Sequence, residues 1–486
     1  MSPAAIAVLV VCIVCGAAVL VLLAVPFVRA ARFRPEKEEG YPDFPVSCDK
    51  EKAVADLAEM VRCRTVSDTD ESREDEAEFE KFEKLLPRLF PNVYKACEFT
   101  KLGKRSLLFR WKGKDSSVSR VLMAHYDVVS VEQSLWQKPA FEGIIEDGVL
   151  WGRGTLDTKG TLNGVMQAAE SLIGQGFVPR NDVYFAFSGN EETNGYGAPT
   201  IVKYFKEKGI RPALVCDEGG AVVENVFPGV AAPCALIGIA EKGICNVRFS
   251  VEGKGGHASA PPPHTAVGVL SRACAAVEDH PFPGKVAKPA AEMFDTLGRR
   301  STFLYRLIFA NLGIFRGVLD SICKKSGGEL NALMRTTVAF TQMSGSKGMN
   351  VIPPRAEMVA NLRIMSGETV EESVAYLKKV IGNDDVRIEV IYGTDPSNVS
   401  ETQGEAWEMM KRAVSQTWRG ALVSPYLMLA CSDSRHYGEI SDHVYRFSAM
   451  ALSKEERASI HGNDERIPLE KAVQTVEFYL RLLAQF

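Results

Sequence analysis

An apolar run ends in two adjacent carboxylates in the stretch Asp182-Val-Tyr-Phe-Ala-Phe-Ser-Gly-Asn-Glu-Glu192. The run is typical of a buried strand, and Ser188-Gly189 marks its end. Two neighbouring carboxylates repel each other and lose hydration on burial, so a buried pair needs cations or protons nearby. The stretch therefore predicts a metal site just beyond the end of one strand.

Further residues of metal-binding type end or follow other runs in the same way, at His125, Asp127, Asp157, Asp217 and His461. In open α/β sheets, the loops after the carboxyl ends of parallel strands converge on one crevice. Taken singly, His125 could be a core histidine, and Asp157 and Asp217 could be helix N-caps. Together with Glu191 and Glu192 they predict one site.

Length and composition restrict the class of protein. A chain of 486 residues exceeds what one hydrophobic core usually supports, so two domains are expected. With 46% hydrophobic and 24% charged residues, the composition is that of a soluble globular protein. A formal net charge of −4 gives no electrostatic reason to expect a nucleic-acid partner, so a small substrate fits better.

The order of strand-type and helix-type segments predicts two domains, one inserted in the other. From about Ser106 to Ala240 the two kinds of segment alternate, as in a parallel sheet with helical crossovers. From Gly243 the pattern becomes strand, helix, strands, helix, strand, which indicates a smaller α+β domain of the kind that often forms homodimers. We predict an α/β catalytic domain with a parallel-type sheet and helices on both faces, at residues 49–240 and 399–486, and an inserted lid or dimerisation domain at 241–398.

One segment of the predicted lid, residues 303–315, is apolar on nearly every face and should be buried. We expect it in the core of the lid or in a dimer interface. An apolar wall of the substrate cleft and a second membrane contact are the alternatives.

The N-terminus differs from the rest of the chain. Residues 1–28 contain no charged side chain, and residues 4–28 are long enough to span a bilayer, so we predict a single-pass transmembrane anchor there, followed by a linker at residues 29–48. A cleaved signal peptide is the rival interpretation, but the usual basic segment before the apolar stretch is missing.

Two observations suggest on which side of the membrane the body lies. Arg29, Arg32, Arg34 and Lys37 follow the apolar stretch and no basic residue precedes it, which favours a cytoplasmic body. The body has an odd number of irregularly spaced cysteines, so we expect reduced thiols. An extracytoplasmic body stays open as the alternative.

Nine motifs carry a family resemblance, in the order Met123-Ala-His-Tyr-Asp-Val-Val, Trp151-Gly-Arg-Gly-Thr-Leu-Asp-Thr-Lys-Gly, Ser188-Gly-Asn-Glu-Glu, Asp217-Glu-Gly-Gly, Gly255-Gly-His-Ala-Ser, Asn331-Ala-Leu-Met-Arg-Thr-Thr, Asn350-Val-Ile-Pro, Asp433-Ser-Arg-His-Tyr and Ile460-His-Gly. From about Cys48 onward the chain resembles the M20 family of metallopeptidases, and within it the carboxypeptidase-S-like branch. Each motif is weak alone, but the set in this order is specific.

The resemblance implies two zinc ions per subunit, with manganese or cobalt as alternatives. It implies that Asp157 bridges the ions, that His125 and Asp217 complete one of them, and that Glu192 and His461 complete the other. Glu191 would remain unligated as the general base, and Asp127 would fix the tautomer of the His125 ring.

The resemblance also implies roles for residues of the predicted lid. His257 would stabilise the oxyanion of the tetrahedral intermediate, often in the cleft of the partner subunit, and Asn350 and Arg363 would contact the substrate. Arg363 would bind the free carboxylate of the substrate with a two-pronged hydrogen bond. Thr158 and Cys431 depart from residues that are common in the family.

These observations together predict a dinuclear metallohydrolase that cleaves amide bonds next to a free carboxylate, by attack of a metal-held hydroxide. The substrate is a small peptide, as for a carboxypeptidase or dipeptidase, or an N-acyl amino acid. A catalytically silent, membrane-anchored binding protein is the rival from another class. The intact Glu191 argues against that rival, because a protein that only binds metal has no use for the base.

Overall fold

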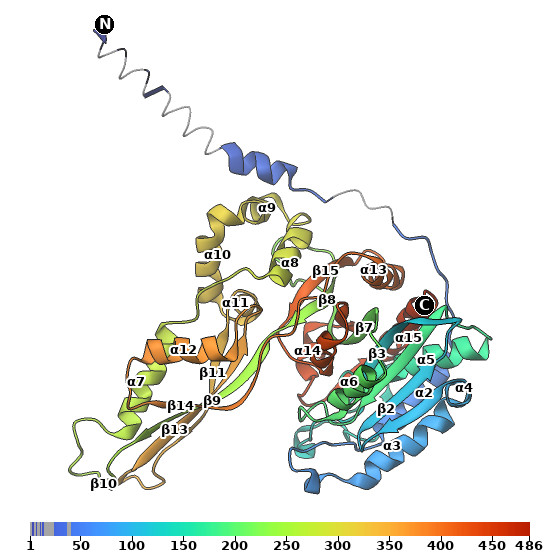
Figure 1. Ribbon diagram of the computed structural model, residues 1–486, viewed down its shortest axis with the longest axis horizontal. Helices are drawn as coiled ribbons and strands as arrows, with labels where there is room; N and C mark the ends of the chain where they lie inside the picture. Colours follow the sequence, from blue (N-terminus) through green and yellow to red (C-terminus); the bar gives the residue numbers. More distant parts are fainter. Residues whose placement is uncertain (1, 4–5, 7–9, 11, 14–23, 36–39) are drawn as a thin grey trace.

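The structure is a computed structural model, and it describes residues 2–3, 6, 10, 12–13, 24–35 and 40–486 (Figure 1). Most of the predicted anchor at residues 4–28 lies outside the described residues. Within the described ranges, no helix has the length and apolar character needed to cross a bilayer. The anchor therefore stays a prediction from the sequence.

An eight-stranded mixed sheet forms the centre of the molecule. Its strands lie in the order β1 (Glu98–Leu102), β2 (Ser106–Trp111), β6 (Asn181–Ser188), β3 (Asp115–His125), β7 (Leu214–Val223), β16 (Val444–Ala451), β8 (Cys234–Glu241) and β15 (Leu422–Met428). The pairs β6–β3, β3–β7, β7–β16 and β8–β15 are parallel. The pairs β1–β2, β2–β6, β16–β8 and β7–β8 are antiparallel. The sheet is therefore mixed and mostly parallel, whereas the sequence predicted a parallel-type sheet.

Helices cover both faces of this sheet, as predicted. One face packs against α2 (Lys50–Val61), α3 (Glu76–Leu89), α4 (Pro91–Ala96), α5 (Lys159–Gly174), α13 (Glu405–Thr417) and α15 (Leu469–Leu483). The other face packs against α6 (Gly197–Glu207) and the short helix η3 (Asp433–Glu439).

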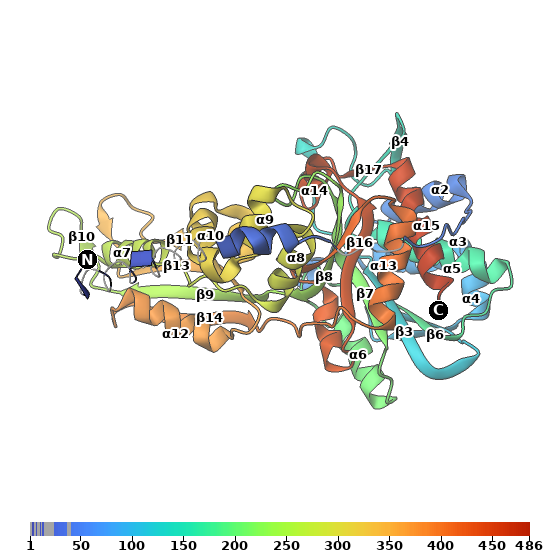
Figure 2. The same cartoon turned by 90° about the horizontal axis from the view of Figure 1, so that it is seen from above.

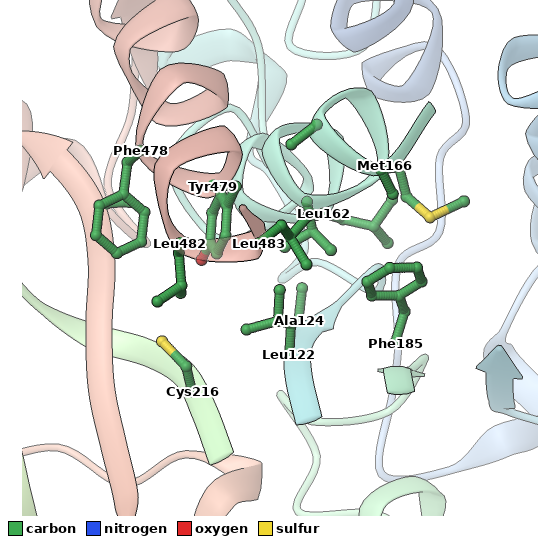
Figure 3. Close-up of a cluster of buried hydrophobic side chains, with 14 of the residues drawn as sticks. Leu122, Ala124, Leu162, Met166, Phe185, Cys216, Phe478, Tyr479, Leu482 and Leu483 are labelled. Carbon is green, nitrogen blue, oxygen red and sulfur yellow. The ribbon is translucent and has the colours of Figure 1, made fainter. Parts of the chain in front are cut away.

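The side chains of β3 show why both faces are covered. Leu122 and Ala124 enter the core with α5 and α15 (Figure 3). Val121 and Met123 enter the core with α6. Successive side chains of a strand point to opposite faces, so an uninterrupted apolar run needs a layer on each side.

Shorter elements connect these layers. They are η1 (Glu71–Arg73), η2 (Gln133–Leu135), α14 (Lys454–Ser459) and a three-stranded sheet of β17 (Arg466–Pro468), β5 (Val149–Trp151) and β4 (Ile144–Glu146).

A second, antiparallel sheet lies within the interval predicted as an insertion. Its strands have the order β11 (Thr337–Ser344), β13 (Arg355–Ile364), β9 (Gly243–Glu252) and β14 (Arg387–Thr394). Helices α7 (Ala266–Asp279) and α12 (Val370–Ile381) share a core with β9 and β13. At its far tip, β10 (Gly256–His257) pairs with β12 (Val351–Ile352), far from the large sheet in both views (Figure 1, Figure 2).

Four other helices of the same interval join a core that the large sheet shares. They are α8 (Lys288–Gly298), α9 (Phe303–Phe309), α10 (Leu312–Ser326) and α11 (Gly328–Ala332), with α8 in direct contact with β15. Met293 and Phe309 share a core with Leu236 of β8 and Leu427 of β15. The predicted boundaries of the inserted domain stay a prediction, but part of its helical content clearly belongs to the core of the large sheet.

Candidate active site

Asp157 contacts two histidines that are far apart in the sequence. Its Oδ1 lies 2.9 Å from Nε2 of His125, at the end of β3, and its Oδ2 lies 3.0 Å from Nε2 of His461, just after α14. Nε2 of His461 also lies 3.0 Å from Oε2 of Glu192, which follows β6. Asp157 thus joins two groups of side chains with its two oxygens.

Two overlapping groups of ligand-type atoms meet at this point. His125, Asp157 and Glu192 form one group, and His125, Glu191 and Glu218 form the other, with all ligand atoms of each group within 4.8 Å of one another. Oε1 of Glu218, in β7, lies 3.3 Å from Nε2 of His125. Four residues predicted to be metal ligands, His125, Asp157, Glu192 and His461, therefore come together.

The donor set fits two divalent ions. The carboxylates of Asp157, Glu191, Glu192 and Glu218 carry four negative charges if ionised, and two divalent ions carry four positive ones. Imidazole and carboxylate ligands about 2.0–2.1 Å from a tetrahedral zinc ion lie about 3.3 Å apart, close to the separations given above. Burial of so many acids without cations would cost several kcal/mol per ion.

Asp127 holds residues of the cluster in place through hydrogen bonds. Its two oxygens accept the backbone N–H groups of Glu191 and Glu192, both at 3.1 Å, and its Oδ2 accepts the Ser67 hydroxyl at 2.7 Å. Nδ1 of His125 lies 3.0 Å from the carbonyl oxygen of Asp127 and 3.4 Å from its Oδ1. Because Nδ1 faces these acceptors, Nε2 is left to face Asp157.

Glu191 has the environment of a proton acceptor. Burial raises its pKa well above the ordinary value, and the nearby carboxylates of Glu218 and Asp433 raise it further. Its carboxylate belongs to the group formed with His125 and Glu218, and not to the group of His125, Asp157 and Glu192. A carboxyl with a raised pKa can take up a proton near neutral pH.

Asp217, predicted to be a metal ligand, points elsewhere. Its Oδ2 accepts the backbone N–H of Ser434 at 2.9 Å, and burial raises its pKa to about 6. The structure places its neighbour Glu218 beside His125 instead. Adjacent strand residues point to opposite sides, so only one member of this acidic pair can enter the cluster.

Glu465 was not singled out from the sequence, yet it organises the loop before Asp157. This fully buried carboxylate accepts the backbone N–H groups of Gly154, Leu156 and Asp157 at 2.8–3.2 Å, and Arg153 Nη1 donates to it at 2.7 Å. Its place in a charged stretch, four residues after His461, gave no signal of burial.

His257 and Asn350 lie together, but at the tip of the antiparallel sheet. The backbone N–H of Ala258 donates to the carbonyl oxygen of Asn350 at 3.0 Å, and the hydroxyl of Ser259 lies 2.7 Å from Nδ1 of His257. His257 is exposed. Strand β10, which contains His257, lies far from β3 and β7, which carry His125 and Glu218, so within one chain this tip does not reach the cluster (Figure 1).

Arg363 and Arg435 converge on Cys431, near the junction of the two sheets. Nη1 of Arg363 donates to Cys431 Sγ at 3.5 Å, and Nη2 of Arg435 donates to Asn194 Oδ1 at 2.8 Å, in the turn that carries Glu191 and Glu192. Nη1 of Arg435 is buried and has no hydrogen-bond partner. Among the described residues, no carboxylate lies within 4 Å of either guanidinium group in an ion pair, so an anion could bind here.

Comparisons with known proteins identify the family of this chain. Residues 121–485 match the sequence profile described as Peptidase family M20/M25/M40. The chain belongs to this family.

Two relatives and one solved structure show which M20 proteins the chain is similar to. It is 34% identical over 477 residues to "Probable carboxypeptidase S-like 2" of Dictyostelium discoideum, covering 96% of this chain and 91% of the relative. It is 33% identical over 441 residues to "N-fatty-acyl-amino acid synthase/hydrolase PM20D1" of Xenopus tropicalis, covering 90% and 86%. The fold is similar to that of an M20 family metallo-carboxypeptidase from Sulfolobus solfataricus, with a TM-score of 0.61, 16% identity and coverage of 89% and 99%.

Membership of the M20 family agrees with the resemblance that the nine motifs indicated. The carboxypeptidase-S-like and PM20D1 relatives match over nearly the whole chain. The chain is therefore an M20-type peptidase or amidohydrolase.

Proposed function

We propose that this enzyme is a dinuclear metal-dependent hydrolase of amide bonds that lie next to a free carboxylate. The contact of Asp157 with both His125 and His461 carries the proposal, because a carboxylate between two imidazoles is the arrangement that a bridging ligand needs. His125, Asp157 and Glu218 would hold one ion, and Asp157, Glu192 and His461 the other. Zinc suits these ligands best, with manganese or cobalt as alternatives.

The bound ions would lower the pKa of a water and polarise the scissile carbonyl. Glu191 then takes the proton of the attacking water, and passes it to the leaving amine. Asp127 holds both Glu191 and Glu192 through their backbone N–H groups, so the base and one ligand keep a fixed relation. Because the base is already held in place, less entropy is lost when the reacting groups reach the geometry that the reaction needs.

The requirement for a free carboxylate is supported by the two guanidinium groups beside Cys431. Arg363 was expected to bind the substrate, and Arg435 adds a buried donor nitrogen with no partner. Two guanidinium groups beside Cys431, neither of them in an ion pair with a carboxylate among the described residues, favour an anionic ligand.

Two candidate activities differ in the acyl part of the substrate. A carboxypeptidase or dipeptidase accepts a peptide, and the Dictyostelium relative is named as carboxypeptidase-like. An N-acyl-amino-acid hydrolase accepts a fatty acyl group, and the Xenopus relative is named for that activity. Both candidates share the same site and the same carboxylate recognition.

A substrate screen tests the proposal. Purified full-length enzyme, loaded with zinc and with its metal content measured, is incubated with dipeptides, N-acetyl amino acids and long-chain N-acyl amino acids. We expect release of the free amino acid from at least one class, abolished by chelation and restored by added zinc. Metal-loaded enzyme that cleaves none of these classes would refute the proposal.

The position of His257 and Asn350 supports a homodimer. Both lie at the tip of the antiparallel sheet, so they would reach the cluster of a partner subunit rather than their own. Mixing inactive His257→Ala subunits with inactive Glu191→Gln subunits should restore part of the activity. No recovery, despite demonstrated subunit exchange, would place His257 in its own chain's site.

We also propose an uncleaved N-terminal anchor with the catalytic body on the cytoplasmic side. The charge-free residues 1–28 and the arginines that follow support it. A cysteine introduced at exposed Val178 should resist a membrane-impermeant thiol reagent in intact cells and react after lysis. Labelling before lysis, or a mature N-terminus beyond Val28, would contradict this topology.

A further inference from the structure

Helices α9 and α10 expose an unusual number of large apolar side chains. Ile314, Val318 and Ile322 of α10 are 58%, 53% and 48% exposed, and Phe303 and Leu304 of α9 are 44% and 67% exposed. A spacing of four residues places the three α10 residues on one side of the helix. We call these five residues the apolar face.

The opposite side of α10 packs against the core of the protein. Cys323 is buried in the core of the large sheet, and Leu312 and Leu319 pack against that core. The sequence predicted burial for residues 303–315, and Phe309 fulfils it, whereas Phe303, Leu304 and Ile314 do not. Contiguous exposed apolar surfaces on soluble domains mark contacts with other proteins or with membranes.

The N-terminal segment contacts the rest of the protein beside the apolar face. The ring of Phe27 stacks on that of Phe303 with 6.4 Å between centroids, and Nδ2 of Asn311 donates to the carbonyl oxygen of Pro26 at 3.0 Å. Ala30 is fully buried, and both views show residues 24–32 over α9 (Figure 1, Figure 2). The charge-free sequence of residues 1–28 therefore leads directly onto the apolar face.

Basic side chains lie on α10 and on the N-terminal segment, whose Phe27 contacts Phe303. They are the exposed residues Arg29, Arg32, Arg34 and Arg316. The acidic residue of α10, Asp320, is already paired with Arg335 and with Lys324. Basic side chains on the segments that carry or contact exposed apolar ones match the boundary between anionic headgroups and acyl chains.

From these observations we propose that the apolar face rests on a lipid bilayer, with Phe303, Leu304, Ile314, Val318 and Ile322 at the boundary between headgroups and acyl chains. This goes beyond the proposed hydrolase activity and does not depend on it. A hydrolase body held in this way would meet amphiphilic N-acyl substrates in the phase into which they partition.

Tryptophan fluorescence in vesicles tests the contact. The full chain is reconstituted in phosphatidylcholine vesicles, with and without anionic phosphatidylglycerol, using acyl chains that are brominated or unbrominated. Val318→Trp places a reporter in the apolar face, and Val390→Trp is the matched control, because Val390 is 42% exposed on β14 of the antiparallel sheet. We expect brominated lipid to reduce the added emission of Val318→Trp at least twofold and to leave that of Val390→Trp unchanged.

Equal quenching of the two reporters would overturn the proposal. A second copy of the chain is the other possible occupant, and unquenched Val318→Trp together with disulfide cross-linking between two Val318→Cys chains would establish it and exclude the bilayer. The unmodified chain gives a check that needs no substitution. A photoactivatable lipid should label peptides from residues 303–322 and spare those from 387–394, and the reverse pattern would also overturn the proposal.

Discussion

Asp157 and His461 lie 3.0 Å apart, between Oδ2 and Nε2, although all strands of the antiparallel sheet lie between them in the chain. The other oxygen of Asp157 contacts His125 at 2.9 Å. One side chain therefore connects the two halves of the proposed metal site.

The first prediction follows from this shared role. Asp157→Ala should lose both ions, because each of them loses a ligand and the two positive charges lose the carboxylate between them. His461→Ala should lose one ion more readily than the other, because His461 lies beside Asp157 and Glu192, the other ligands proposed for that ion. Elemental analysis of the purified variants measures the stoichiometry, and two ions retained in Asp157→Ala would refute the bridge.

The second prediction separates two adjacent acids. Glu218→Gln should weaken metal binding more than about tenfold, since even the loss of an outer-shell partner costs about 10- to 100-fold. Asp217→Asn should keep its metal, because the amide oxygen can still accept the N–H of Ser434. Competition with a chelator measures both affinities, and the opposite ranking would restore Asp217 as the ligand.

Asp217 and Glu218 show which part of the site cannot be predicted from the sequence. The meeting of His125, Asp157, Glu192 and His461 was predictable, because loops after parallel strands converge at one edge of a sheet. The choice between Asp217 and Glu218 depends on the twist and direction of one strand, which residue types do not reveal. The remote position of His257 depends on the length and angle of the antiparallel sheet, and the exposure of Ile314 depends on how α10 rotates on its core.

The third prediction concerns carboxylate recognition. Arg435→Lys and Arg363→Lys keep the charge but lose the forked donor, so kcat/KM for a substrate with a free carboxylate should fall about 10- to 100-fold, the equivalent of about 1.5–3 kcal/mol. For an analogue whose carboxylate is converted to an amide, the same substitutions should lower kcat/KM much less. Equal losses on both substrates would mean that Arg435 only holds Asn194 in place.

The fourth prediction is a pH dependence of stability that comes from Lys242. Burial lowers its pKa to about 7, and its Nζ donates to the carbonyl oxygens of Ala332 and Arg335 at 3.0 and 2.7 Å. An unfolded lysine stays protonated up to about pH 10.4, so between pH 7 and 10 the unfolded chain binds more protons than the folded one. Rising pH therefore favours the folded state in this window.

Substitution isolates that contribution. The free energy of unfolding of the native chain should rise from pH 7 to pH 9 relative to that of Lys242→Met, by at most about 1.4 kcal/mol per pH unit. Urea unfolding of both proteins at the two pH values measures the difference. Parallel pH profiles would show that Lys242 is not held below its ordinary pKa.

The most direct test of the central claim is the turnover of Glu191→Gln beside its metal content. The substitution removes the proposed proton acceptor and leaves every proposed ligand in place, so we predict two ions per subunit and a fall in kcat of about 10²–10⁴-fold or more. Metal content close to that of the native enzyme with hydrolysis nearly abolished supports a metal site served by a separate glutamate base. Hydrolysis at the native rate, with both ions bound, would contradict the account.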